Sequence, residues 1–163
     1  MRYRLITCAL MLIAFLPAFA GKKADKQTLQ WRYEVQELNV VAKDGKSVIF
    51  KIWSYGKKSN VALMQAGKNA VHAVIFKQIG YNPALIASEA LTLEQEEFFK
   101  LFFQDGGEYM RFVQLANNGA VAPTDNIKLD KEYKVGVKVT VNRADLRKYL
   151  EEHGIVESMN TLF

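Results

Sequence analysis

The chain has few of the side chains on which most enzymes and metal sites depend. Its 163 residues include one cysteine, two histidines and three prolines. The cysteine, Cys8, lies in an N-terminal segment that we expect to be removed, so we expect neither a disulfide nor a thiolate metal centre. The sequence also lacks the H-E-x-x-H, calcium-loop and G-x-S-x-G motifs. These absences predict a protein that is not an enzyme and that holds no cofactor and no metal.

Residues 1–20 have the features of a signal peptide. Arg2 and Arg4 precede an apolar run from Leu5 to Leu16, and Pro17–Ala20 ends in an A-x-A cleavage site. Cleavage would leave 143 residues with 20 basic and 17 acidic side chains. The apolar run is shorter than the ~20 residues of a membrane-spanning helix, and no cysteine follows it for lipid attachment. We therefore expect a periplasmic or secreted protein with no stable membrane span after cleavage.

Alternating aromatic and β-branched residues predict four strands. Residues 21–28 are lysine-rich and predict a flexible basic leader. Strands are expected at 29–41 and 47–55, joined by a type I′ turn at Asp44-Gly45, and again at 108–116 and 133–141. Residues 117–126 have the composition of a loop.

Three helices are expected between and after these strands. The first begins at Val61 with Ser59 or Asn60 as its cap, and the second begins at a Thr92-x-x-Gln95 capping box and stops at Gly106-Gly107. The third runs from Asn142 to about residue 153, with a glycine at 154 to end it. Residues 29–163 thus predict a single α+β domain: a mostly antiparallel four-stranded sheet with helices packed on one face.

The first helix has an alanine-rich side and a polar side. Its small and aliphatic residues predict close packing across the first hairpin; they are Ala62, Leu63, Ala66, Ala70, Ala73 and Val74. Gln65, Lys68, Asn69 and His72 share the opposite stripe, which we expect to face solvent. His72 and His153 are accordingly interpreted as surface histidines.

The second helix carries an unusual concentration of phenylalanine. Phe98, Phe99, Phe102 and Phe103, with Leu101, spread round more than half of its circumference. One interpretation is an interaction surface for a partner or a groove for an apolar ligand. The other is a helix wedged between the sheet and a loop.

Other charged groups offer weaker candidates. Lys57 and Lys58 precede the first helix and could contact an anion. Glu94 and Glu97 complement the dipole at the start of the second helix, and with His72 they form a less favoured hydrolase hypothesis.

A nucleic-acid partner is not expected. Lysines 51, 134 and 138 could line a basic sheet face beside aromatic side chains. However, an export signal and a mature charge of only +3 argue against nucleic-acid binding.

Residues 47–155 resemble a group of exported bacterial modules, most clearly at their C-terminal end. The strand Tyr133–Val141, the helix Asn142–Leu150 and the following Gly154-Ile155 are similar to the end of the flagellar assembly protein T and Helicobacter Lpp-type lipoprotein group. The spacing of the alanines in the first helix is also similar, although the lipobox cysteine is missing. The segment Lys68–Lys77 resembles uncharacterised secreted proteins of Bacteroides-type bacteria. The resemblance implies an assembly or envelope role and implies no catalytic residue.

Two functions remain open on this evidence. The first is an exported non-enzymatic binding or assembly module of the bacterial cell envelope that engages another envelope protein or itself. The alternative is a small carrier that holds an apolar ligand in a phenylalanine-lined pocket.

Overall fold

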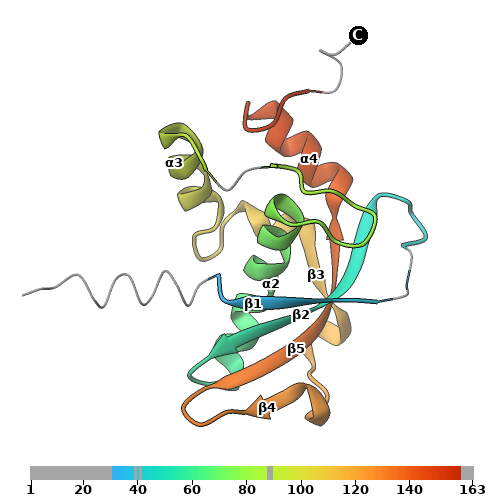
Figure 1. Cartoon of the computed structure of the whole chain (residues 1–163), viewed down its shortest axis with the longest axis vertical. Coiled ribbons are helices and arrows are strands. Elements are labelled where there is room, and N and C mark those ends of the chain that lie inside the picture. Colours follow the sequence, from blue (N-terminus) through green and yellow to red (C-terminus); the bar gives the residue numbers. More distant parts are fainter. Residues whose placement is uncertain (1–30, 39, 41, 88–89, 159–163) are drawn as a thin grey trace, which may run out of the picture.

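A five-stranded antiparallel sheet with helices packed on it forms the described part of the chain (Figure 1). The computed structural model describes residues 31–38, 40, 42–87 and 90–158. The predicted signal peptide (1–20) and leader (21–28) lie outside the described residues. The strand order is β1-β2-β5-β3, and β4 also pairs with β5. The predicted α+β single-domain class is thereby confirmed.

The central pair of the sheet is formed by β2 (Ser47–Gly56) and β5 (Tyr133–Asn142). They pair along their whole length, from Ser47 opposite Asn142 to Gly56 opposite Tyr133. Alternate side chains of both strands are buried, as the sequence pattern predicts; they include Val48, Phe50, Ile52, Val135, Val137, Val139 and Val141.

The first hairpin is confirmed, but its predicted tight turn is wrong. β1 (Tyr33–Glu37) pairs with β2, and residues 38–46 connect them. The Asp44 carboxylate accepts hydrogen bonds from the backbone N–H groups of Lys46 and Ser47, both at 2.9 Å, and Gly45 has φ +62°. Asp-Gly is therefore a local turn within a longer connection, because the aspartate side chain supplies the stabilising bonds.

The predicted strand at 108–116 is mostly wrong, and one strand was missed. Residues Glu108–Phe112 form a 3-10 helix, η1, and only Val113–Leu115 forms a strand, β3. Tyr109 and Phe112 are buried while Met110 is exposed, a spacing of three that fits a 3-10 turn rather than a strand. The missed strand β4 (Asn126–Lys128) lies entirely exposed along β5, so no alternation marks it in the sequence.

The two short strands share one edge of β5. β3 pairs with the C-terminal half of β5 and β4 pairs with its N-terminal half. Two single 3-10 turns, η2 (Ala116–Gly119) and η3 (Pro123–Asp125), connect them. The sheet therefore has five strands rather than the predicted four.

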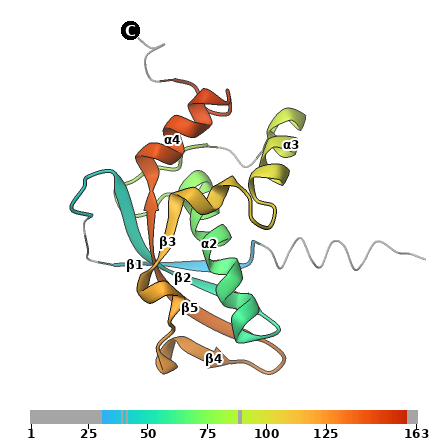
Figure 2. The ribbon, with the colours of Figure 1, turned by 180° about the vertical axis from the view of Figure 1, so that it is seen from behind.

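Helix α2 (Ser59–Phe76) lies across the sheet, as Figure 2 shows from behind. Its alanines Ala62, Ala66, Ala70 and Ala73 have no exposed surface. A Cβ atom on Gly56 would lie 2.6 Å from the backbone nitrogen of Ala62, so the strand and the helix meet more closely than any other residue would permit. The predicted caps at Ser59 and Asn60 are wrong, because the helix begins after Lys58 with no side-chain cap.

Helices α3 (Leu93–Phe102) and α4 (Arg143–Glu152) begin as the sequence predicts. Thr92 and Gln95 form the expected capping box, and the Asn142 side chain accepts a hydrogen bond from the backbone of Asp145. Gly154 ends α4 with φ +68°. Both helices stand at one end of the molecule (Figures 1 and 2).

The contact between α2 and the sheet can be tested by adding volume to it. Ala70→Leu inserts three carbon atoms where no surface is exposed, so we expect the free energy of unfolding to fall by about 1–3 kcal/mol. Urea denaturation measures this change. Met64→Leu, on the exposed side of α2, is the control and should leave stability nearly unchanged; an equal effect of both substitutions would contradict the close packing.

Candidate functional site

A groove of about 970 Å³ opens between the start of β1, helix α2 and helix α3. Aromatic rings line it from all three elements; the apolar and aromatic lining consists of Trp31, Tyr33, His72, Phe76, Leu91, Phe99 and Phe103. The charged and polar lining consists of Lys68, Lys77, Glu96, Glu97, Lys100, Gln104 and Asp105. We refer to this feature as the aromatic groove.

The rings of the aromatic groove are packed against one another. The Trp31 and His72 rings are stacked with centroids 3.9 Å apart, and Phe103 meets Trp31 edge-on at 4.9 Å. Phe76 lies 4.6 Å from His72 on the other side. Because each ring is held by its neighbours, the wall they form has a fixed shape before any ligand arrives.

The prediction that His72 is a surface histidine is wrong. Its side chain is half-buried among these rings, and its Nδ1 is hydrogen-bonded to the Tyr33 hydroxyl at 2.8 Å. Burial, with a smaller contribution from the charge of Lys77, lowers the pKa of His72 to about 4. The imidazole is therefore neutral near pH 7 and contributes a flat polarisable surface rather than a charge.

Two further residues of the α2 stripe that was expected to face solvent are also buried. Lys68 and Asn69 are both buried. The Asn69 amide donates a hydrogen bond of 2.8 Å to Ser54 of β2, and the Lys68 ammonium reaches Asp105 at 2.7 Å. These polar partners allow α2 to bury part of its polar side.

The phenylalanines of α3 lie mainly in the interior. Phe99, Phe102 and Phe103 are buried, and Phe98 is half-buried against α4 through Tyr149 and His153. Most of the interaction surface proposed for these side chains is therefore not at the surface. In the described part of the chain their rings pack against Phe76 of α2, Phe112 of η1 and Tyr149 of α4, so α3 is wedged among other helices rather than between the sheet and a loop. Phe99 and Phe103 nevertheless contribute to the lining of the aromatic groove. Leu101, in contrast, is exposed.

The cations of the aromatic groove differ in their partners. Lys68 pairs with Asp105 at 2.7 Å and Lys100 with Glu97 at 3.5 Å. The hydrogen bond and charge of Lys68 lower the pKa of Asp105. Lys77 instead lies over the Tyr33 ring, with its Nζ 4.4 Å from the ring centroid.

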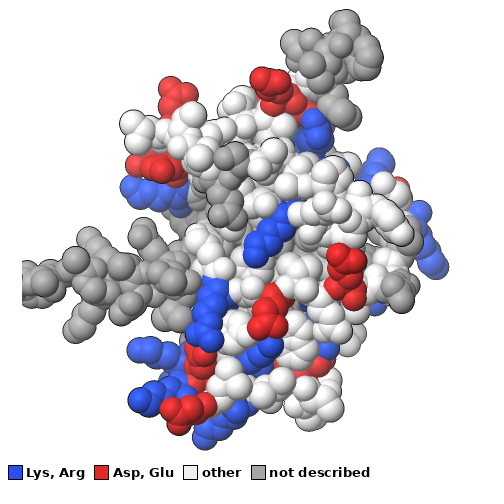
Figure 3. All heavy atoms as spheres, in the orientation of Figure 1, with Lys and Arg blue, Asp and Glu red and all other residues white. Residues whose placement is uncertain are grey.

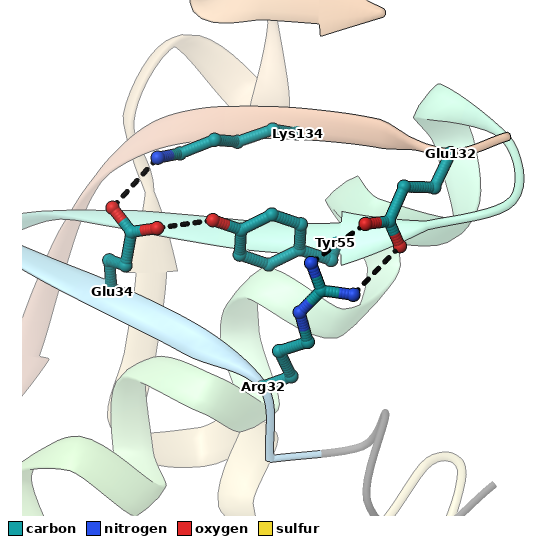
Figure 4. Close-up of polar contacts among 5 residues, drawn as sticks. All are labelled: Arg32, Glu34, Tyr55, Glu132 and Lys134. Carbon is teal, nitrogen blue, oxygen red and sulfur yellow. Dashed lines mark hydrogen bonds and ion pairs between the residues drawn. The ribbon is translucent and has the colours of Figure 1, made fainter. Parts of the chain in front are cut away.

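The opposite face of the sheet carries ion pairs and hydrogen bonds between charged side chains and Tyr55 (Figure 4). The Lys134 ammonium pairs with Glu34 at 2.7 Å, Tyr55 donates a hydrogen bond to the same carboxylate, and Arg32 pairs with Glu132. The Lys134 and Tyr55 hydrogen bonds lower the pKa of Glu34. Lys51 likewise pairs with Asp125 at 2.5 Å.

This face is therefore not the basic platform considered from the sequence. Figure 3 shows Lys and Arg mixed with Asp and Glu over the face of the molecule that it presents. Two of the three lysines considered, Lys51 and Lys134, are neutralised by carboxylates, while Lys138 is exposed.

The remaining candidates are dispersed. Lys57 and Lys58 are exposed in the turn before α2, away from the residues that line the aromatic groove. Glu97 and His72 both line the aromatic groove, but the hydrogen bond of His72 goes to Tyr33, and Glu94 lies at the exposed start of α3. Within the described residues, no three His, Cys, Asp or Glu side chains gather as a metal site would require.

Sequence reasoning missed Trp31, Phe76 and Lys77 as site residues. Two signals were present: Trp31 and Tyr33 alternate in the first predicted strand, and His72 and Phe76 are one helical turn apart. Neither segment reveals that the rings of the first strand and the rings of the helix pack against each other in the folded chain.

Comparison with known proteins adds no relative: no protein-family model, curated protein or solved structure matches the chain. Among the described residues, no helix combines the length and apolar character needed to cross a membrane.

The buried position of His72 predicts a pH-dependent stability. Unfolded histidine has a pKa near 6.5, so between that value and about 4 the unfolded chain binds more protons and stability falls as the pH is lowered. We expect the His72 contribution to decline by about 2 kcal/mol between pH 7 and pH 5.

Urea unfolding at both pH values, on the natural chain and on His72→Phe, measures this contribution. The variant should lose less stability on acidification, because phenylalanine has no proton to bind. Identical losses in the two proteins would show that His72 is not the titrating group.

Proposed function

We propose that this protein is an exported, non-enzymatic binding protein that holds a small apolar ligand in the aromatic groove. The observation that carries the proposal is the wall of mutually packed rings contributed by β1, α2 and α3. The proposal adopts the carrier alternative, because two of the four phenylalanines in and after α3, Phe99 and Phe103, contribute to the lining of this groove.

The size and chemistry of the groove support a small ligand. Ligand sites commonly have volumes of 300–1,000 Å³, and this groove, at about 970 Å³, lies at the upper end of that range. Its lining combines a wall of aromatic rings with an equal number of charged and polar side chains. Each CH₂ group that moves from water to such a wall contributes about 0.8 kcal/mol to the free energy of binding. A ligand of modest size therefore gains useful affinity without any covalent chemistry.

The rigidity of the groove supports binding as well. Trp31 is fixed between His72 and Phe103, and His72 is fixed by its hydrogen bond to Tyr33. Side chains that are already immobile lose little conformational entropy when a ligand arrives. This arrangement favours affinity over the adaptability that an exposed, unsupported aromatic patch would give.

An assembly module of the cell envelope is a second candidate function. It is favoured by two leucines on the outer side of α3, Leu93 and Leu101, whose exposed fractions are 82% and 62%. These could contact another envelope protein or a second copy of the chain. Each is a single side chain with a charged neighbour in the sequence, Glu94 beside Leu93 and Lys100 beside Leu101, which makes this surface weaker support than the aromatic groove.

The binding proposal is tested with N-phenyl-1-naphthylamine, an uncharged apolar probe that fluoresces when it leaves water. We expect saturable binding to one site and a loss of affinity of at least about tenfold in Trp31→Ala, because the substitution removes roughly 1.5–3 kcal/mol of apolar contact. Titration by fluorescence gives both dissociation constants.

Trp53→Ala supplies the matched control, because Trp53 lies on the opposite face of the sheet beside Lys51 and Lys134. It should bind the probe as the natural chain does. Circular dichroism confirms that both variants are folded. Equal affinity in all three proteins, or no saturable binding in the natural chain, would overturn the proposal.

The assembly candidate has a separate test. If α3 mediates self-association, light scattering after size-exclusion chromatography should show a dimer that Leu101→Ser converts to a monomer. A natural chain that is monomeric at high concentration would contradict self-association through this helix.

A further inference from the structure

Lys77 occupies a distinctive position in the aromatic groove. It is the first residue after α2, it is exposed, and its ammonium lies over the Tyr33 ring at 4.4 Å from the centroid. Its charge is close enough to His72 to contribute to the lowered pKa of that imidazole. The ammonium therefore lies beside the ring wall, at the solvent-exposed edge of the groove.

Lys77 is also the groove cation without an acidic partner in the described part of the chain. Lys68 is neutralised by Asp105 and Lys100 by Glu97, whereas no carboxylate of residues 31–38, 40, 42–87 and 90–158 lies within 4.0 Å of the Lys77 ammonium. A cation beside an apolar wall attracts an anion more strongly than one surrounded by water.

The carboxylates of the groove belong to the other wall. Glu96, Glu97 and Asp105 are carried by α3 and the turn that follows it. These carboxylates would repel a negatively charged ligand group that approached α3. The anionic end of a ligand is therefore directed away from α3 and toward Lys77 at the end of α2. The wall between them is uncharged near pH 7 because His72 is neutral there.

We propose that the ligand of the aromatic groove is a small organic anion with an apolar body, which lies on the rings of Trp31, His72, Phe76 and Phe103 while its acid group pairs with Lys77. This inference rests on the proposed binding function and specifies its ligand class. A fatty acid or an aryl carboxylate has this chemistry: one negative charge at the end of an uncharged hydrocarbon.

The test compares two probes that differ by one acid group. 8-Anilino-1-naphthalenesulfonate is N-phenyl-1-naphthylamine with an added sulfonate. We expect the natural protein to bind the sulfonate probe about fivefold more tightly than the uncharged probe, in line with one partly exposed ion pair. In Lys77→Gln this advantage should disappear while the affinity for the uncharged probe is retained.

Lys131→Gln is the matched control, because Lys131 is an exposed lysine in the turn before β5 and is not part of the groove lining. It should keep the preference for the sulfonate. If the preference survives in Lys77→Gln, or falls equally in Lys131→Gln, the assignment of Lys77 is overturned.

A second pair of ligands repeats the test with aliphatic bodies. Laurate and dodecanol have the same chain length and differ in their charge, and each can displace the uncharged probe from the groove. Laurate should displace it at about fivefold lower concentration than dodecanol in the natural chain and at equal concentration in Lys77→Gln.

The two proposals fail in different ways. Equal displacement by laurate and dodecanol in the natural chain would contradict the proposal of an anionic ligand, while the proposed binding function would still stand. Failure of the uncharged probe to bind at all would remove the binding function itself.

Discussion

The close contact between α2 and the β2–β5 pair is the constraint on which the rest of the structure depends. Four alanines of α2 lie against the sheet with no exposed surface, and Gly56 permits the chain to turn from β2 into the helix at a distance no side chain would allow. Because small side chains bring the helix axis near the sheet, the flanks of α2 come within reach of β1 and of the segment that follows β3. The helix is thereby covered on more than its alanine side.

The aromatic groove is a consequence of that geometry. With α2 held low on the sheet, His72 and Phe76 lie level with Trp31 and Tyr33 at the start of β1, and α3 closes the third side with Phe99 and Phe103. The polar groups displaced inward find partners: Asn69 with Ser54, Lys68 with Asp105, and His72 with Tyr33. No helix of the described part of the chain packs on the opposite face of the sheet, where ion pairs such as Glu34–Lys134 bridge the strands (Figures 2 and 4).

Local signals predicted the elements better than the surfaces. The alternating valines of β5, the capping box at Thr92 and the Asn142 cap are each specified within a few residues, and all three are present in the structure. The stretch at Tyr109–Phe112 was misread because its aromatic and apolar residues are typical of strands, although their spacing of three is that of a 3-10 turn. The exposed strand β4 carries no pattern at all. The site was less predictable. The environment of His72 is made by β1 and α3, which are separate from α2 in the sequence. They cover a face of α2 whose residue types predict exposure to solvent.

The proposed amphipathic anion site rests on two features: a wall of mutually packed rings, and one groove cation, Lys77, that lacks an acidic partner among the described residues. The most direct measurement is the set of nuclear Overhauser contacts between bound laurate and the protein. Contacts from the hydrocarbon chain to the rings of Trp31, Phe76 and Phe103, with the carboxyl end nearest Lys77, are predicted. Contacts confined to Trp53 and Tyr55 on the opposite face of the sheet would contradict the assignment.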